Sequence, residues 1–189
     1  MIPSRRSFLQ GAGLGLLTFT LAGTDVLLTP RQARARGADF RVLGEHEIAL
    51  LEALGDVLVP GAAQAGIAHF VDQQLGVDPD DCLLMARYLN VEPPYAGFYR
   101  AGLKAIDELS RRQLERPFAS VDEASAIDVV RSFAQATPPA WPPEGEAPPA
   151  PLVYLLLRSD AVDVVYGTVE GFGQLNIPYM PHILPPRNW

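Results

Sequence analysis

The chain of 189 residues is poor in cysteine and lysine, with one of each, Cys82 and Lys104. A single cysteine excludes an internal disulfide, a CxxCH haem-attachment site and an iron–sulfur cluster held by cysteines of this chain. Acidic residues outnumber basic ones by 22 to 15, so the net charge is −7. Because binding to nucleic-acid phosphates requires clustered Lys and Arg, nucleic acid is not an expected partner.

Recognisable catalytic motifs are also missing. There is no GxGxxG between a strand and a helix, no Walker loop and no GxSxG elbow. The three histidines are His46, His69 and His182. His69 and Asp72 have a spacing that can share a metal ion, but a third and fourth ligand are lacking. Glu45-His46-Glu47 are sequence neighbours on a helix and point in different directions. We therefore predict no catalytic residues, no cofactor site and no metal site in this chain.

Two further groups have ordinary structural interpretations. Asp160 and Asp163 are spaced as paired carboxylates for acid–base chemistry, but a solvated helix face is the favoured interpretation, because no basic partner accompanies them. Cys82 is expected to be a small buried residue, with an intermolecular disulfide as the alternative.

Residues 1–35 have the layout of an export leader. Two arginines come first, an uncharged stretch Ser7–Thr24 follows, and Ala33-Arg34-Ala35 supplies the small residues of a peptidase site, with cleavage expected after Ala35. A membrane anchor is the competing interpretation. It is marginal, because the 18-residue stretch contains four glycines and about 20 apolar residues are needed to span a bilayer.

The leader resembles a twin-arginine export signal, with Arg5, Arg6, Phe8 and Leu9 at the motif positions and Gln10 where lysine is preferred. The resemblance implies export of a folded protein to the periplasm. Without residues 1–35 the chain has 11 basic and 21 acidic residues, a net charge of −10 over 154 residues.

The fold class expected for residues 36–166 is all-α, a small irregular bundle of five or six helices with almost no strand. Apolar spacing and capping residues predict helices over 45–58, 67–75, 79–89, 95–115, 120–134 and 152–166. Ser120-Val121-Asp122-Glu123 is interpreted as the capping box of the fifth helix. Seven prolines in residues 137–151 exclude a helix there, which leaves a linker or a strap packed on the domain.

Residues 167–189 are expected to form an extended, non-helical tail, because glycine and proline are frequent in them. The tail is nonetheless rich in large apolar side chains, which are costly to leave in water. It either packs on its own domain or lies on a partner, and the second is favoured. The predicted partner-contacting residues are Tyr166, Gly167, Phe172, Pro178, Tyr179, Met180, His182 and Trp189.

An ordered set of short motifs is similar to the small subunit (subunit 3, or gamma) of gluconate 2-dehydrogenase-type complexes. The matching stretches are 50–61 (LLEALGDVLVPG), 70–75 (FVDQQL), 99–103 (YRAGL), 157–160 (LRSD), 165–167 (VYG) and 177–179 (IPY). The Pro-rich insertion and the tail sequence Gly171-Phe172-Gly173 depart from the family pattern.

The resemblance implies a non-catalytic accessory subunit without a cofactor of its own. Its partner is a large flavoprotein of the glucose–methanol–choline oxidoreductase type, which holds FAD and oxidises a sugar or polyol. A cytochrome c subunit with haem c, or another acceptor, then takes the electrons. The flavoprotein often crosses the membrane bound to the small subunit. Membrane contact is expected only through the leader or the assembled complex.

Two alternatives from other function classes stay open. One is an independent periplasmic module that holds a small ligand between helices, with Arg87, Arg100 or Arg158 binding an anion. The other is a redox or metal enzyme that uses His46, His69 and Cys82.

Overall fold

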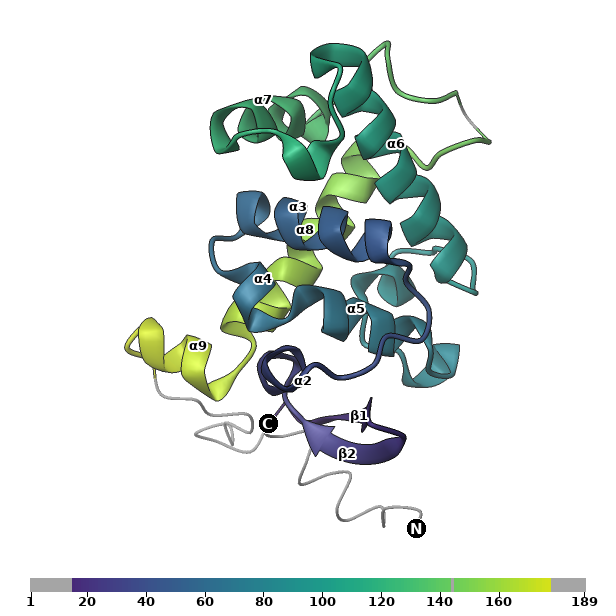
Figure 1. Cartoon of the computed structure of the whole chain (residues 1–189). Helices are drawn as coiled ribbons and strands as arrows, with labels where there is room; N and C mark the ends of the chain where they lie inside the picture. Colours follow the sequence, from purple (N-terminus) through teal and green to yellow (C-terminus); the bar gives the residue numbers. More distant parts are fainter. Residues whose placement is uncertain (1–14, 144, 178–189) are drawn as a thin grey trace, which may run out of the picture.

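The computed structural model describes residues 15–143 and 145–177, which fold mainly into helices (Figure 1). The elements in chain order are β1 Leu17–Leu21, β2 Thr24–Leu28, α2 Pro30–Arg36, α3 Glu45–Leu58, α4 Ala62–Ala65, α5 Ile67–Leu75, the 3₁₀ helices η1 Pro79–Asp81 and η2 Met85–Tyr88, α6 Ala96–Leu114, the 3₁₀ helix η3 Phe118–Ser120, α7 Glu123–Ala134, α8 Ala150–Tyr166 and α9 Val169–Gln174. The predicted all-α class is confirmed.

Helix α8 is the central element of the bundle, and α3, α4, α5 and α7 all pack against it (Figure 1). It is apolar on most sides, as expected for a helix enclosed by others. Its Val153 and Leu156 are almost completely buried. Helix α6 also approaches α8 closely, at Gly102, where an added Cβ would lie 3.0 Å from the Val153 side chain. The core therefore surrounds α8.

The predicted helix over residues 79–89 is wrong as a continuous helix. Asp78 caps the segment as expected, accepting a hydrogen bond from the Asp80 N–H at 2.9 Å. The turn ends after Asp81, however, because the side chain of Gln74 accepts from the Leu83 N–H at 2.6 Å and holds the backbone outside a helix. Two 3₁₀ turns, η1 and η2, take its place.

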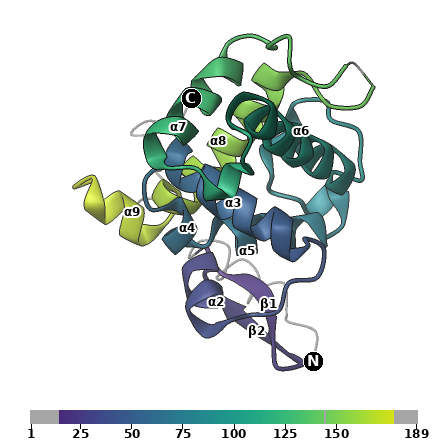
Figure 2. The same ribbon diagram turned by 45° about the horizontal axis from the view of Figure 1, so that its top comes forward.

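The described residues hold one small antiparallel hairpin, in keeping with the expectation of almost no strand. Strands β1 and β2 pair with Leu21 opposite Thr24, and the two turn residues Ala22 and Gly23 have φ values of 49° and 79°. Such positive φ values match the twist of a tight hairpin. The hairpin and α2 lie at one end of the molecule, beside α5, in both views (Figure 2). Except for Arg36 at the end of α2, they fall within the predicted leader, residues 1–35.

The Pro-rich segment is a strap rather than a loose linker over its described residues. Trp141 is 5% exposed, and its ring centroid lies 5.4 Å from that of Phe133 on α7. Its indole N–H donates to the Pro148 carbonyl at 2.9 Å. Arg112 of α6 donates to the Ala140 carbonyl at 2.7 Å.

The first part of the predicted extended tail is helical, which is a second correction. Helix α9 begins after Thr168, whose hydroxyl accepts from the Gly171 N–H at 3.0 Å. This N-cap offsets the poor helix propensity of the glycines. The remainder of the tail, 178–189, lies outside the described residues.

Smaller differences concern helix ends and short turns. The N-cap of α7 is Asp122, which accepts from the Ser125 N–H at 3.0 Å, and not Ser120, which ends η3. Helix α4 was not predicted. Among the helices of the described ranges, none combines the length and the apolar character needed to span a membrane.

Candidate partner interface

Two of the short motifs meet in the core through Tyr99 and Asp160. The Tyr99 hydroxyl donates to Oδ2 of Asp160 at 2.6 Å, which joins α6 to α8. Asp160 is completely buried, so its expected place on a solvated helix face is wrong. This burial has no local signal in the sequence, because the partner Tyr99 is 61 residues away.

The Asp160 carboxyl has an unusual environment. Its Oδ1 has no hydrogen-bond partner within the described structure. Burial raises the pKa of Asp160 to about 7, and the Tyr99 hydroxyl and the Met85 backbone only partly oppose this shift. Burial raises the pKa of Tyr99 well above its usual value, and the neighbouring Asp160 carboxyl adds to this shift. The pair is sealed from solvent, and its evident role is to position α6 on α8.

A third motif residue, Asp72, organises the loop before α3. Its Oδ1 accepts from the Val42 and Leu43 N–H groups at 2.8 Å each, and its Oδ2 accepts from the Arg41 N–H at 2.9 Å. Three successive peptide donors thus converge on one carboxylate of α5. Such charge-assisted hydrogen bonds are stronger than neutral ones, so Asp72 fixes the loop.

The same loop is held from α6 by a fourth contact. Arg100, also a motif residue, donates to the Val42 carbonyl at 2.5 Å and forms an ion pair with Glu47 at 3.3 Å. The motifs at 70–75 and 99–103 therefore meet at one loop, although they are separated in the sequence.

The candidate metal ligands are not assembled. His69 is buried, its Nε2 lies 3.3 Å from the Ala38 carbonyl, and its ring packs on Phe40 with centroids 4.2 Å apart. Burial lowers the pKa of His69. Since Asp72 uses both oxygens for the loop, the pair does not share an open site. The described residues contain no group of three or more His, Cys, Asp or Glu side chains placed to hold a metal ion.

The other titratable candidates are dispersed. His46 is exposed, and its Nε2 lies 3.4 Å from Oδ2 of Asp107. Cys82 is completely buried, which confirms the structural interpretation of this residue. Burial raises the pKa of its thiol. His182 lies outside the described residues.

The three arginines considered for anion binding also do not converge. Arg87 donates to the Cys82 carbonyl at 3.1 Å and lies over the Tyr88 ring. Arg100 is paired with Glu47. Arg158 is exposed on α8.

Helix α9 is fixed to the end of α8 through two glycines. An added Cβ at Gly171 would lie 2.2 Å from the Val165 carbonyl oxygen, and one at Gly167 would lie 2.5 Å from the Asp163 carbonyl oxygen. Both distances are far below van der Waals contact. The turn from α8 into α9 therefore requires glycine at both positions.

Three apolar side chains on and after α9 are exposed, those of Val169, Leu175 and Ile177, and we call them the α9 surface. They are 46%, 50% and 50% exposed. Of the predicted contact residues, Tyr166 and Phe172 are half-buried and Gly167 is exposed. Pro178, Tyr179, Met180, His182 and Trp189 lie outside the described residues.

Helix α8 also carries two exposed apolar side chains. Leu155 and Val162 are 44% and 36% exposed. Seven residues apart, they share one side of α8.

A cavity of about 220 Å³ separates the end of α8 from the N-terminal elements. Its lining residues are Gly15, Leu17, Pro30, Phe70, Leu83, Asp163, Val164, Gly167 and Thr168. Asp163 is its one charged group, and partial burial raises the pKa of that carboxyl. The cavity is smaller than the roughly 300–1,000 Å³ typical of ligand pockets.

The structure defines a class: a helical domain whose motif residues Asp72, Tyr99, Arg100 and Asp160 make internal contacts, and whose exposed apolar side chains include those of the α9 surface. The sequence matches the family Gluconate 2-dehydrogenase subunit 3 over residues 45–185, and the chain belongs to that family. No curated protein and no solved structure matches it. Family membership places the chain among the subunits of dehydrogenase complexes.

Proposed function

We propose that the chain is the non-catalytic small subunit of a periplasmic FAD-dependent dehydrogenase that oxidises a sugar or polyol. The large flavoprotein subunit holds FAD and depends on this chain for twin-arginine export and for stability. A cytochrome c subunit with haem c, or another acceptor, takes the electrons. The family match and the Arg5-Arg6 motif support this proposal.

The observation that carries the proposal is the α9 surface. Val169, Leu175 and Ile177 present large apolar side chains to solvent immediately before the apolar residues of the tail. Exposed apolar patches mark sites of protein association. An obligate contact of this kind buries more than about 1,600 Å², to which the surface and the tail can both contribute.

The mechanism of stabilisation is burial of apolar surface against the flavoprotein. Helix α9 is seated on α8 through Gly167 and Gly171, and α8 is fixed in the core by Asp160. The α9 surface is thus presented by a rigid support, which lowers the entropy lost on association.

The alternative of an independent small-ligand module has less support. The cavity near α8 falls below the usual volume of ligand pockets, and Arg87, Arg100 and Arg158 do not line it.

One test replaces Ile177 with aspartate and compares it with Ile127→Asp, which places the same change at a 37% exposed isoleucine on α7. Both chains are expressed with the flavoprotein, and the flavin recovered with the chain is measured by its absorbance. Ile177→Asp is expected to lower recovery about tenfold, the effect of a contact of roughly 1.4 kcal/mol, while Ile127→Asp leaves it unchanged. Equal recovery from both variants would contradict the role of the α9 surface.

A second test addresses export. Replacement of Arg5 and Arg6 by lysine keeps the charge but removes the twin arginine, so both subunits are expected to stay in the cytoplasm. Arg36→Lys is the matched control, and with it both subunits reach the periplasm. Periplasmic flavoprotein in the twin-lysine strain would overturn the export role.

A further inference from the structure

The residues around the expected cleavage site belong to a folded unit, residues 17–38, which we call the N-terminal unit. It comprises the β1–β2 hairpin, α2 and the two residues after α2. Phe19, Leu28, Ala33 and Ala38 form its own small core, and each is at most 4% exposed. Helix α2 packs on α4 and α5, so the unit covers one face of the main domain.

The main domain is shaped to receive this unit at Gly66. An added Cβ at Gly66 would lie 2.2 Å from the Pro30 carbonyl oxygen. Gly66 also has φ of +89°, which only glycine adopts readily. The start of α2 therefore lies directly on the backbone between α4 and α5.

Ion pairs connect the unit to two separate helices of the main domain. Arg34 pairs with Glu52 on α3 at 3.0 Å, and Arg31 pairs with Glu170 on α9 at 3.3 Å. Each exposed pair contributes little energy. Their partners on two different helices nonetheless fix the orientation of α2.

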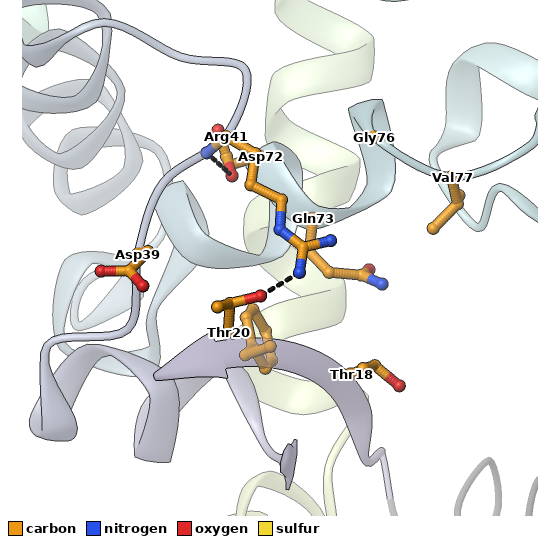
Figure 3. A pocket seen from close by; sticks show the side chains of 9 residues that line it. Thr18, Thr20, Asp39, Arg41, Asp72, Gln73, Gly76 and Val77 are labelled. Carbon is orange, nitrogen blue, oxygen red and sulfur yellow. Dashed lines mark hydrogen bonds between the residues drawn. The ribbon is translucent and has the colours of Figure 1, made fainter. Parts of the chain in front are cut away.

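Arg41 connects the hairpin to the loop that Asp72 holds (Figure 3). Its backbone N–H donates a hydrogen bond to Asp72. Its guanidinium donates to the hydroxyl of Thr20 on β1 and forms an ion pair with Asp25 at 3.0 Å. Figure 3 shows the Arg41 side chain extended from the loop toward β1, beside a small cavity of about 40 Å³. The hairpin is thus attached to the same carboxylate that organises the start of α3.

The sequence at the expected cleavage site encodes a helix with both ends capped. Thr29 and Gln32 form a reciprocal capping box, and Pro30 occupies the first turn. Gly37 ends the helix in the left-handed conformation, with φ of 65°. Ala33, one of the two small residues a peptidase would read, is completely buried.

We propose that the N-terminal unit is retained in the exported protein as a permanent part of the domain, and that Ala33-Arg34-Ala35 is not a processing site. Proteases cut exposed, loosely held segments, and this segment is a capped helix packed on the core. The proposal deepens the proposed function and rests on it for export. The uncharged stretch Ser7–Thr24 thus contributes β1, Leu17–Leu21, to the retained unit.

The decisive experiment determines the mass of the periplasmic protein, purified through a tag inserted at the exposed Gly145 so that both termini stay native. The expected N-terminus lies at or before Leu17. An N-terminus at Arg36 would overturn the proposal. Periplasmic location and co-purified flavin are recorded in the same preparation, so a failure of the export role is seen separately from cleavage at Ala35.

A protease experiment on the full chain, expressed in the cytoplasm, tests the same point without export. Phe19→Asp places a charge in the small core of the unit, and Thr18→Asp places it on the exposed side of the same strand. Trypsin is expected to cut the Phe19→Asp variant at least about tenfold faster than the wild-type chain or the Thr18→Asp variant, because cleavage follows the population of the opened state. The expected cleavage sites are the peptide bonds after Arg31, Arg34 and Arg36. Rapid cleavage of the wild-type chain at these arginines would overturn the proposal.

Discussion

The hydroxyl of Tyr99 lies 2.6 Å from Oδ2 of Asp160, completely inside the helical core. Each residue belongs to a different short motif of the family, and the contact joins α6 to α8. The other oxygen of this carboxyl, Oδ1, has no hydrogen-bond partner within the described structure.

We expect Asp160 to make stability depend on pH. Its folded-state pKa of about 7 lies above the ordinary 3.8, so between these values the folded state binds more protons than the unfolded state. The free energy of unfolding therefore falls as pH rises through this window, by roughly 4 kcal/mol in total.

The Asp160→Asn variant tests this expectation, because its side chain does not titrate and should flatten the dependence of stability on pH. Urea unfolding at several pH values measures it, with Asp128→Asn, an exposed carboxylate on α7, as the control. Parallel pH profiles for wild type and Asp160→Asn would refute the assignment.

Removal of the Tyr99 hydroxyl should be destabilising. Tyr99→Phe leaves the buried carboxyl without its side-chain donor, at an expected cost of about 1–3 kcal/mol. The cost should be larger above pH 7, where Asp160 is ionised, than at pH values near 5. Thermal unfolding of the variant and of Tyr88→Phe, whose ring is 62% exposed, provides the comparison. A pH-independent cost would show that the hydroxyl acts without the carboxylate.

Gly171 should be required for the seating of α9. Gly171→Ala places a Cβ 2.2 Å from the Val165 carbonyl oxygen, so α9 must move away from α8. Gly173→Ala lies in the same helix with nothing within 4 Å of the added Cβ and should be neutral or slightly stabilising. Hydrogen exchange of the α9 amides and flavoprotein recovery are the measurements. Similar protection in both variants would contradict the proposed seating.

Asp72 should contribute strongly to stability without any metal. Asp72→Ala removes the acceptor of three backbone N–H groups, at an expected cost of about 3 kcal/mol. Asp39→Ala, at an exposed residue of the same region, should cost little. Unfolding with and without a chelator distinguishes this structural role of Asp72 from a metal-binding role. If Asp72 bound a metal ion, a chelator would lower the stability of the wild-type chain.

Helices α5 and α6 were predictable because each has an apolar face and clear end signals. Gly76 follows α5 and the Pro93-Pro94 pair precedes α6, and both helices lie close to their predicted ranges, 67–75 and 95–115. The two 3₁₀ turns that replace the helix over 79–89 were not predictable, because the side chain that ends η1 belongs to Gln74, on another element.

The burial of Asp160 could not be predicted, for a similar reason. Helix α8 is apolar on most sides, so its sequence indicates no solvent face, and the stabilising donor Tyr99 is distant in the chain. The hairpin had a local signal in Ala22-Gly23, but these residues lie in a stretch with the composition of a leader.

The central claim is that this chain works as the accessory subunit of a flavoprotein dehydrogenase. The most direct measurement is purification of the full chain from the periplasm of its native host, through an internal tag at Gly145, with identification of what accompanies it. The account predicts a large partner with flavin absorbance and dye-linked activity on a sugar or polyol panel. Recovery of the chain alone, colourless and stable, would contradict it.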